Sequence, residues 1–133
     1  GIHVDADGLV HHGPRLTWMD AAIDGVPVTP REGKAVEVQA LWYNALKTMA
    51  LLSKTLGEDA SGYELRAEQA AKSLKATFWN EETGSLFDVV ADRFRDAPAR
   101  PNQILAVSLD HSMLDSSMSE SVVRFVWRKQ AHA

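Results

Sequence analysis

The stretch KAVEVQALWYNALKTMALLSKTL, residues 34–56, decides the fold of this chain. It holds good helix formers and neither proline nor glycine, so a helix can run through it without a break. A helix that is apolar nearly all round is buried, and apolar residues cover most of this one. They are Val36, Val38, Leu41, Trp42, Ala45, Leu46, Met49, Leu51 and Leu52. The stretch therefore predicts a helix in the interior of the molecule.

A second helix is predicted to begin at Ser61, after the break at Gly57-Glu58-Asp59. Ser61 and Glu64 have the spacing of a capping box, in which each side chain satisfies a free backbone N–H at the start of a helix. The apolar stripe and the polar face are distinct, so this helix is amphipathic and lies on the outside. The side chains predicted to point inward are Leu65, Ala67, Ala70, Ala71, Leu74 and Phe78.

Two more helices are predicted in the last third of the chain. One begins near Asn102 and is apolar on more than one side. The other begins at Ser117, where Ser117 and Glu120 repeat the capping-box spacing. Inner and outer helices then alternate along the chain, as they do in stacked helical hairpins. The predicted fold class is therefore all-α, built of paired-helix hairpins.

The rest of the chain is predicted to hold little regular structure. Glycine and proline interrupt residues 1–33, so this segment is mostly loop, and Asp7-Gly8 is a turn signal for a small ribbon. Residues 85–90 are predicted to form a short extended piece. A length of 133 residues fits one domain.

Composition and charge exclude several classes of function. The 14 lysine and arginine residues are scattered, so no basic run could neutralise a line of phosphates and no nucleic-acid partner is expected. The chain has no cysteine, which excludes disulfides and thiolate chemistry. No apolar stretch approaches the roughly 18 to 20 residues that span a bilayer, and the start lacks the features of a signal peptide. We therefore expect no membrane partner and a cytoplasmic location.

Asp20 is the first candidate for chemistry. It follows Trp18 and Met19, and a carboxylate beside an aromatic ring suits a general acid. The structural alternative is that Asp20 caps a short helix through residues 21–23, because aspartate is a preferred N-cap. The residue types alone favour the capping role.

Glu37 and Trp42 mark a second cluster, near the start of the helix predicted to be buried. A buried carboxylate needs a partner or a function. An ion pair with Lys34 or Arg31 is at least as well supported for Glu37 as contact with a ligand. Trp42 fits a core position better than a platform for a sugar ring.

Asn102 and Gln103 open the other helix predicted to be buried. Their amides could hydrogen-bond sugar hydroxyls, although helix capping explains them more simply. His11 and His12 are adjacent, so their side chains diverge, and no third ligand is spaced nearby. We therefore expect neither a metal nor another cofactor.

Four strings of the sequence resemble, in order, the C-terminal amylo-alpha-1,6-glucosidase domain of glycogen debranching enzymes. They are LTWMDA (16–21), VTPREGKAVE (28–37), ALWYNAL (40–46) and RPNQI (100–104). The resemblance covers most of the chain to about residue 110. It implies that residues 1–133 are a single partial domain of an (α/α)6 barrel. It also implies an inverting hydrolysis of α-1,6-linked glucose at the branch points of glycogen-like glucans.

The resemblance also implies roles for individual residues. Asp20 would be the acid that protonates the leaving oxygen. The residues that would line the substrate pocket are Trp18, Glu37, Trp42, Asn102 and Gln103. An inverting enzyme needs a second carboxylate, roughly 6.5–9.5 Å from the acid, to activate a water. In the family this base lies downstream of the RPNQ string, in a stretch that this sequence does not contain.

The sequence is therefore expected to be a fragment that is inactive alone, with a glucan or an oligosaccharide as the ligand to test. The alternative is a helical interaction module without catalysis. Two inner helices without their barrel neighbours would expose a large apolar patch. Self-association into a homo-oligomer, most simply a two-fold dimer, would cover that patch.

Overall fold

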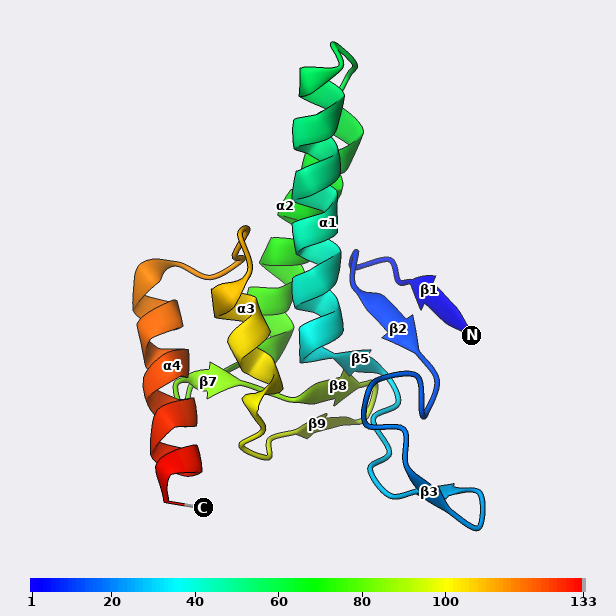
Figure 1. Ribbon diagram of the computed structural model, residues 1–133, viewed down its shortest axis with the longest axis vertical. Helices are drawn as coiled ribbons and strands as arrows, with labels where there is room; N and C mark the ends of the chain where they lie inside the picture. The colour runs from blue at the N-terminus through cyan, green and yellow to red at the C-terminus, as the bar shows by residue number, and fades with distance from the viewer. Residues whose placement is uncertain (133) are drawn as a thin grey trace.

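A long pair of helices stands on a base of short strands, and a further helix packs beside them (Figure 1). The structure is a computed structural model and describes residues 1–132. The α-helices are α1 (Val36–Thr55), α2 (Ser61–Phe78), α3 (Leu105–Ser108) and α4 (Ser116–Ala131). A 3-10 helix, η1 (Pro101–Ile104), leads directly into α3. α1 packs along α2 and also contacts α3.

The strands are two or three residues long and pair antiparallel in small sheets. They are β1 (Ile2–Val4), β2 (Val10–His12), β3 (Ala22–Ile23), β4 (Val26–Pro27), β5 (Lys34–Ala35), β6 (Trp79–Asn80), β7 (Ser85–Leu86), β8 (Val89–Ala91) and β9 (Phe94–Asp96). β1 pairs with β2, β3 with β4, and β6 with β7, whereas β5, β8 and β9 form one three-stranded sheet. A bridge between His12 and Gly33 joins the first ribbon to the segment before β5. Because β5 runs straight into α1, this sheet fixes where α1 begins.

The predicted all-α class is wrong, because the chain is mixed α/β with 47% helix and 17% strand. The predicted paired hairpins of an (α/α)6 barrel are wrong with it. Around the turns at residues 81–84 and 92–93 the chain folds back on itself, so the short runs on either side pair as antiparallel strands. The predicted third helix shrinks to η1 and one turn of α3. α3 ends at Ser108 because the backbone of Leu109 is extended, and the Ser112 hydroxyl donates to the carbonyl of Ala106 at 2.7 Å.

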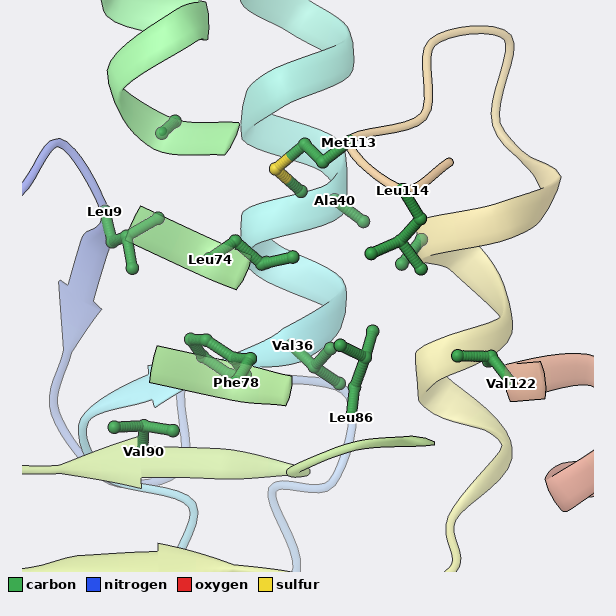
Figure 2. Close-up of a cluster of buried hydrophobic side chains, with 12 residues drawn as sticks. Leu9, Val36, Ala40, Leu74, Phe78, Leu86, Val90, Met113, Leu114 and Val122 are labelled. Carbon is green, nitrogen blue, oxygen red and sulfur yellow. The ribbon is translucent and has the colours of Figure 1, made fainter. Parts of the chain in front are cut away.

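The core lies where the first turns of α1 and the last turns of α2 meet the strands and α3 (Figure 2). Leu74 and Phe78 of α2 are fully buried in it, as is Val36 at the start of α1. Burying each side chain of this size contributes about 1.5–3 kcal/mol. The remaining buried members are Leu9, Ala40, Ala70, Leu86, Val90, Ala106, Met113, Leu114 and Val122. The start of α1 is therefore one of the most firmly held parts of the chain.

The helices predicted at residues 34–56 and from Ser61 are confirmed as α1 and α2. The prediction that α1 is buried nearly all round is wrong, because Leu41, Met49 and Leu52 are exposed. Leu65 of α2, predicted to point inward, is exposed as well. Within residues 1–132 no helix combines the length and the apolar character needed to cross a membrane.

Neither capping box is formed. α2 begins after Asp59, whose carboxylate accepts the backbone N–H of Ser61 at 2.9 Å. α4 is capped by Asp115, whose carboxylate accepts the backbone N–H of Met118 at 2.8 Å. In both places an aspartate lies ahead of the predicted serine. Asp115 is the N-cap of α4, a position that aspartate favours, whereas Asp59 precedes the N-cap of α2, Ala60.

Candidate active site

A buried arginine lies at the centre of the site. Arg31, in the extended segment before β5, is 1% exposed. Its two terminal nitrogens donate to both carboxylate oxygens of Glu37 in the first turn of α1, with Nη2 2.7 Å from Oε2. Its Nε and Nη2 also donate to the carboxylate of Asp88, between β7 and β8, at 2.9 and 3.0 Å. The guanidinium is therefore held by bidentate pairs from two separate elements.

Asp88 connects this ion cluster to the segment ahead of η1. Nη1 of Arg100 donates to the carboxylate of Asp88 and lies 3.4 Å from Oδ2 of Asp96. Two guanidinium groups thus compensate the buried charges of Glu37 and Asp88, as buried charges require. Burial alone lowers the pKa of Arg31, but its hydrogen bonds to Glu37 and Asp88 outweigh burial and raise that pKa. Arg31 therefore stays charged.

The turn that carries Trp18 and Asp20 is fastened to this cluster. The Thr17 hydroxyl oxygen accepts from Nη1 of Arg31 at 3.3 Å and from the backbone N–H of Met19 at 3.3 Å. At the start of η1, Nδ2 of Asn102 lies 3.7 Å from the sulfur of Met19. Residues 17–20 therefore lie beside the first turn of α1 and beside η1.

Trp18 and Asp20 themselves are open to solvent. Trp18 is 70% exposed, and Asp20 is exposed as well. Nε of Arg15 donates to the backbone carbonyl of Asp20 at 3.1 Å, which leaves the carboxylate out of that contact. The alternative that Asp20 caps a helix is wrong, because residues 22–23 form β3. An exposed aromatic ring beside a free carboxylate is a surface that can receive a sugar.

Three other residues predicted from the sequence are built into the fold. Glu37 is buried and pairs with Arg31, which is one of the two ion pairs that the sequence left open. Gln103 is buried and accepts the backbone N–H of Leu86 at 3.0 Å. Asn102 is buried with its amide toward Met19. η1 has no side-chain cap, so helix capping does not account for Asn102 or Gln103.

Trp42 lines a hollow that Asp20 does not reach. Its indole N–H donates to the carbonyl of Gly8 at 3.1 Å. It lines a cavity of about 280 Å³ together with Val4, Asp5, Gly8, Arg66 and Gln69. A larger groove of about 780 Å³ runs along α1 and α2, between Tyr43 and Ala76. Residues 17–20 line neither hollow.

Lys34 forms a second ion cluster instead of pairing with Glu37. Its Nζ lies 2.8 Å from Oδ2 of Asp7 and 3.0 Å from Oδ2 of Asp5. Burial lowers the pKa of Lys34, but the hydrogen bonds to Asp7 and Asp5 outweigh burial and raise that pKa. The hydrogen bond from Lys34 lowers the pKa of Asp5. These contacts tie the turn between β1 and β2 to β5.

The two adjacent histidines diverge as predicted. His12 is buried, with Nδ1 2.8 Å from the carbonyl oxygen of Gly13, whereas the ring of His11 stacks on that of His3 with centroids 4.9 Å apart. Within residues 1–132 no group of three or more histidine, aspartate or glutamate side chains is arranged to hold a metal ion.

Sequence reasoning did not assign Asp88 or Arg100 to the site. A signal for Asp88 was present, because this carboxylate interrupts the apolar run Leu86-Phe87-Val89-Val90. A charged residue inside an apolar run of sequence needs a buried partner. Arg100 belongs to the RPNQ string, but no local pattern reveals that its partner lies twelve residues earlier.

The sequence and the fold both match known proteins. The family model described as amylo-alpha-1,6-glucosidase matches residues 1–131. The glycogen debranching enzyme of Saccharomyces cerevisiae is 42% identical over 57 residues, which cover 35% of this chain and 4% of that protein. The GH78 family rhamnosidase of Bacillus sp. GL1 has a TM-score of 0.70 at 22% identity, over 92% of this chain and 13% of that chain. The chain thus spans a small part of the length of either relative.

The sequence matches place this chain among glycoside hydrolase-related proteins, while the rhamnosidase likeness supports the fold alone. Because the family model covers almost every residue, the chain belongs to the amylo-alpha-1,6-glucosidase family. Its length relative to the debranching enzyme makes it comparable to a segment of such a protein.

Proposed function

We propose that this chain supplies the acid side of a pocket that hydrolyses α-1,6-linked glucose at branch points of glycogen-like glucans. One observation carries the proposal: a turn fixed at Thr17 and Met19 leaves Trp18 and Asp20 open to solvent. Membership of the amylo-alpha-1,6-glucosidase family supports the choice of bond. In this function Asp20 protonates the leaving oxygen, and Trp18 stacks on a sugar ring.

The chain does not complete this reaction alone. An inverting hydrolysis requires a second carboxylate that activates water on the opposite face of the sugar. Glu37 and Asp88 both pair with Arg31, which binds Thr17 of the turn, and Arg100 also binds Asp88. A carboxylate engaged in a buried bidentate pair is not free to take a proton from water. We infer that neither Glu37 nor Asp88 is the base, and the family's pattern assigns that role to a residue downstream of the RPNQ string.

Asp20 also needs a drier environment to act as an acid. General acids in glycosidases are carboxyl groups kept protonated by apolar surroundings. Asp20 is exposed in this chain, so a bound sugar and further protein surface must cover it. In this proposal the exposed ring of Trp18 forms one wall of that cover.

Binding of a branched oligosaccharide by the chain tests the proposal. The ligand is a maltooligosaccharide with one α-1,6-linked glucose, titrated by calorimetry. Trp18→Ala should weaken binding, whereas Trp127→Ala on α4 should not, although Trp127 is 73% exposed and Trp18 70%. Loss of a stacking aromatic costs about 1–3 kcal/mol where rings stack on a flat ligand. Equal affinities for the two variants, or glucose release by the chain alone, would contradict the proposal.

A second candidate function is self-association without catalysis. Leu41, Met49 and Leu52 are exposed and spaced so that they share one face of α1. A second copy of the chain placed against this face would cover it through a two-fold contact. Sedimentation equilibrium should then show a dimer that Leu52→Glu abolishes and that Leu65→Glu, on α2, leaves intact. A stable monomer at high concentration would eliminate this function.

A further inference from the structure

We propose that Thr17 and Arg31 are positioning residues that hold the turn bearing Trp18 and Asp20 in place for the sugar. This inference rests on the proposed function of that turn. Neither side chain is assigned contact with the substrate. Both act through the backbone of residues 17–20.

The guanidinium of Arg31 has one fixed orientation. Its planar group donates hydrogen bonds to Glu37 of α1 and to Asp88 in the connection between β7 and β8. Arg100 holds Asp88 from a further side. Arg31 has five N–H donors in a rigid fork, and these two carboxylates use four of them. The direction of the remaining Nη1 donor is therefore set by the core of the molecule.

That remaining donor binds Thr17. The Nη1 to Oγ1 distance is 3.3 Å, and the same hydroxyl oxygen accepts the backbone N–H of Met19 at 3.3 Å. One oxygen atom thus closes the turn locally and fastens it to a buried charge. The bond from a charged donor is stronger than one between neutral groups. Trp18 follows Thr17 directly, and Asp20 lies three residues on.

Two other contacts hold the turn, and neither involves the carboxylate of Asp20. Nδ2 of Asn102 lies 3.7 Å from the sulfur of Met19, and Arg15 binds the backbone carbonyl of Asp20. Arg31 is 1% exposed and Trp18 70%, so the turn connects a fully buried charged side chain to an open aromatic ring. Preorganised loops bind more tightly because less conformational freedom is lost on binding.

Two substitutions of Thr17 separate positioning from bulk. Thr17→Val keeps the shape of the side chain and removes the hydroxyl, whereas Thr17→Ser keeps the hydroxyl. Methionine-methyl ¹³C NMR of the full chain reports on the turn directly through Met19, with the buried Met113 as an internal control. In Thr17→Val we expect the Met19 methyl to become mobile and the Met113 signal to stay unchanged. Thr17→Ser should restore the Met19 signal of the wild type.

Sugar affinity gives the second readout. Thr17→Val should weaken binding of the branched oligosaccharide about three- to tenfold, as loss of one such hydrogen bond predicts, and Thr17→Ser should match the wild type. Thr17→Ser should melt like the wild type, whereas Thr17→Val should melt at a somewhat lower temperature, because one buried N–H of Arg31 loses its acceptor while Glu37 and Asp88 still hold the guanidinium. If Thr17→Val does not fold, Thr17→Ala removes the hydroxyl without added apolar bulk and is measured in the same way.

The two proposals fail separately. If the wild-type chain binds no oligosaccharide, the proposed function is contradicted, while the Met19 methyl still tests the anchoring of the turn. If the oligosaccharide binds and the Met19 methyl in Thr17→Val remains as ordered as in the wild type, the positioning role is overturned.

Discussion

Replacing Arg31 with methionine tests the buried ion cluster by its contribution to stability. Arg31→Met leaves a side chain of similar length but removes the positive charge that binds Glu37 and Asp88. The side chains of Arg31 and Glu37 are 1% and 6% exposed, so Glu37 would be left as a buried charge without its cation. Removing one partner of a buried pair costs about 3–5 kcal/mol.

Asp88 contributes little to this loss of stability, because in Arg31→Met it keeps its ion pair with Arg100. We therefore assign most of the expected cost to Glu37. Against a total folding stability of about 5–15 kcal/mol, a loss of this size is large. Urea unfolding followed by far-UV circular dichroism measures it as a shift of the transition midpoint.

Two further variants make the measurement specific. Arg124→Met removes the partner of Glu120 on α4, a pair whose side chains are 56% and 70% exposed, and should cost only about 0.2–0.5 kcal/mol. Adding Glu37→Met to Arg31→Met removes the stranded charge and should recover part of the stability. If Arg31→Met costs no more than Arg124→Met, or the double variant recovers nothing, the cluster does not carry the stability assigned to it.

Three more predictions concern parts of the fold outside this cluster. Gly33→Ala should destabilise the chain by about 1–3 kcal/mol in urea unfolding, because φ is +117° and an added Cβ would lie 2.7 Å from a backbone oxygen. Gly25→Ala, at φ +79° with open space around it, should cost less, and equal costs would contradict the crowding at Gly33. Asp115→Ala should cost about 0.5–2 kcal/mol by removing the cap of α4, and an unchanged melting temperature would refute that cap. The lowered pKa of Asp5, caused by its hydrogen bond from Lys34, contributes stability above about pH 4 that is lost as the pH falls through the lower, folded value. Asp5→Asn should therefore flatten the decline in melting temperature below pH 4, and a decline as steep as that of the wild type would contradict this linkage.

The sequence predicted the two long helices, because residues 34–56 hold good helix formers without proline or glycine and the apolar residues after Ser61 form a stripe with the helical period. In residues 79–96 the extended piece predicted at residues 85–90 is confirmed by β7 and β8, but the strands are so short that no two-residue alternation revealed β6, β9 or the pairing of the strands. Sequence reasoning also failed for the outer face of α1. Leucine and methionine there have the residue types of a core, although the structure leaves them open, and sequence composition does not distinguish the two cases.

The site could be predicted only in part. Resemblance singled out Asp20 and Trp18, and residue chemistry named Arg31 as one partner for Glu37. The contribution of Asp88 depends on a contact across 57 residues of sequence, which only the fold creates. The role of Thr17 was missed for the same reason, since a hydroxyl in a loop becomes an anchor only when a buried donor lies within reach.

Glucose release is the most direct test of the central claim that Asp20 is the acid of an α-1,6-glucosidase. Residues 1–131 would replace the matching segment of an active amylo-alpha-1,6-glucosidase, and the exchange must first preserve glucose release from a branched oligosaccharide. Asp20→Asn should then lower the rate by about 10²–10⁴-fold. Asp24→Asn, four residues on and also exposed, should leave it unchanged. Equal rates for the two variants would contradict the assignment of Asp20.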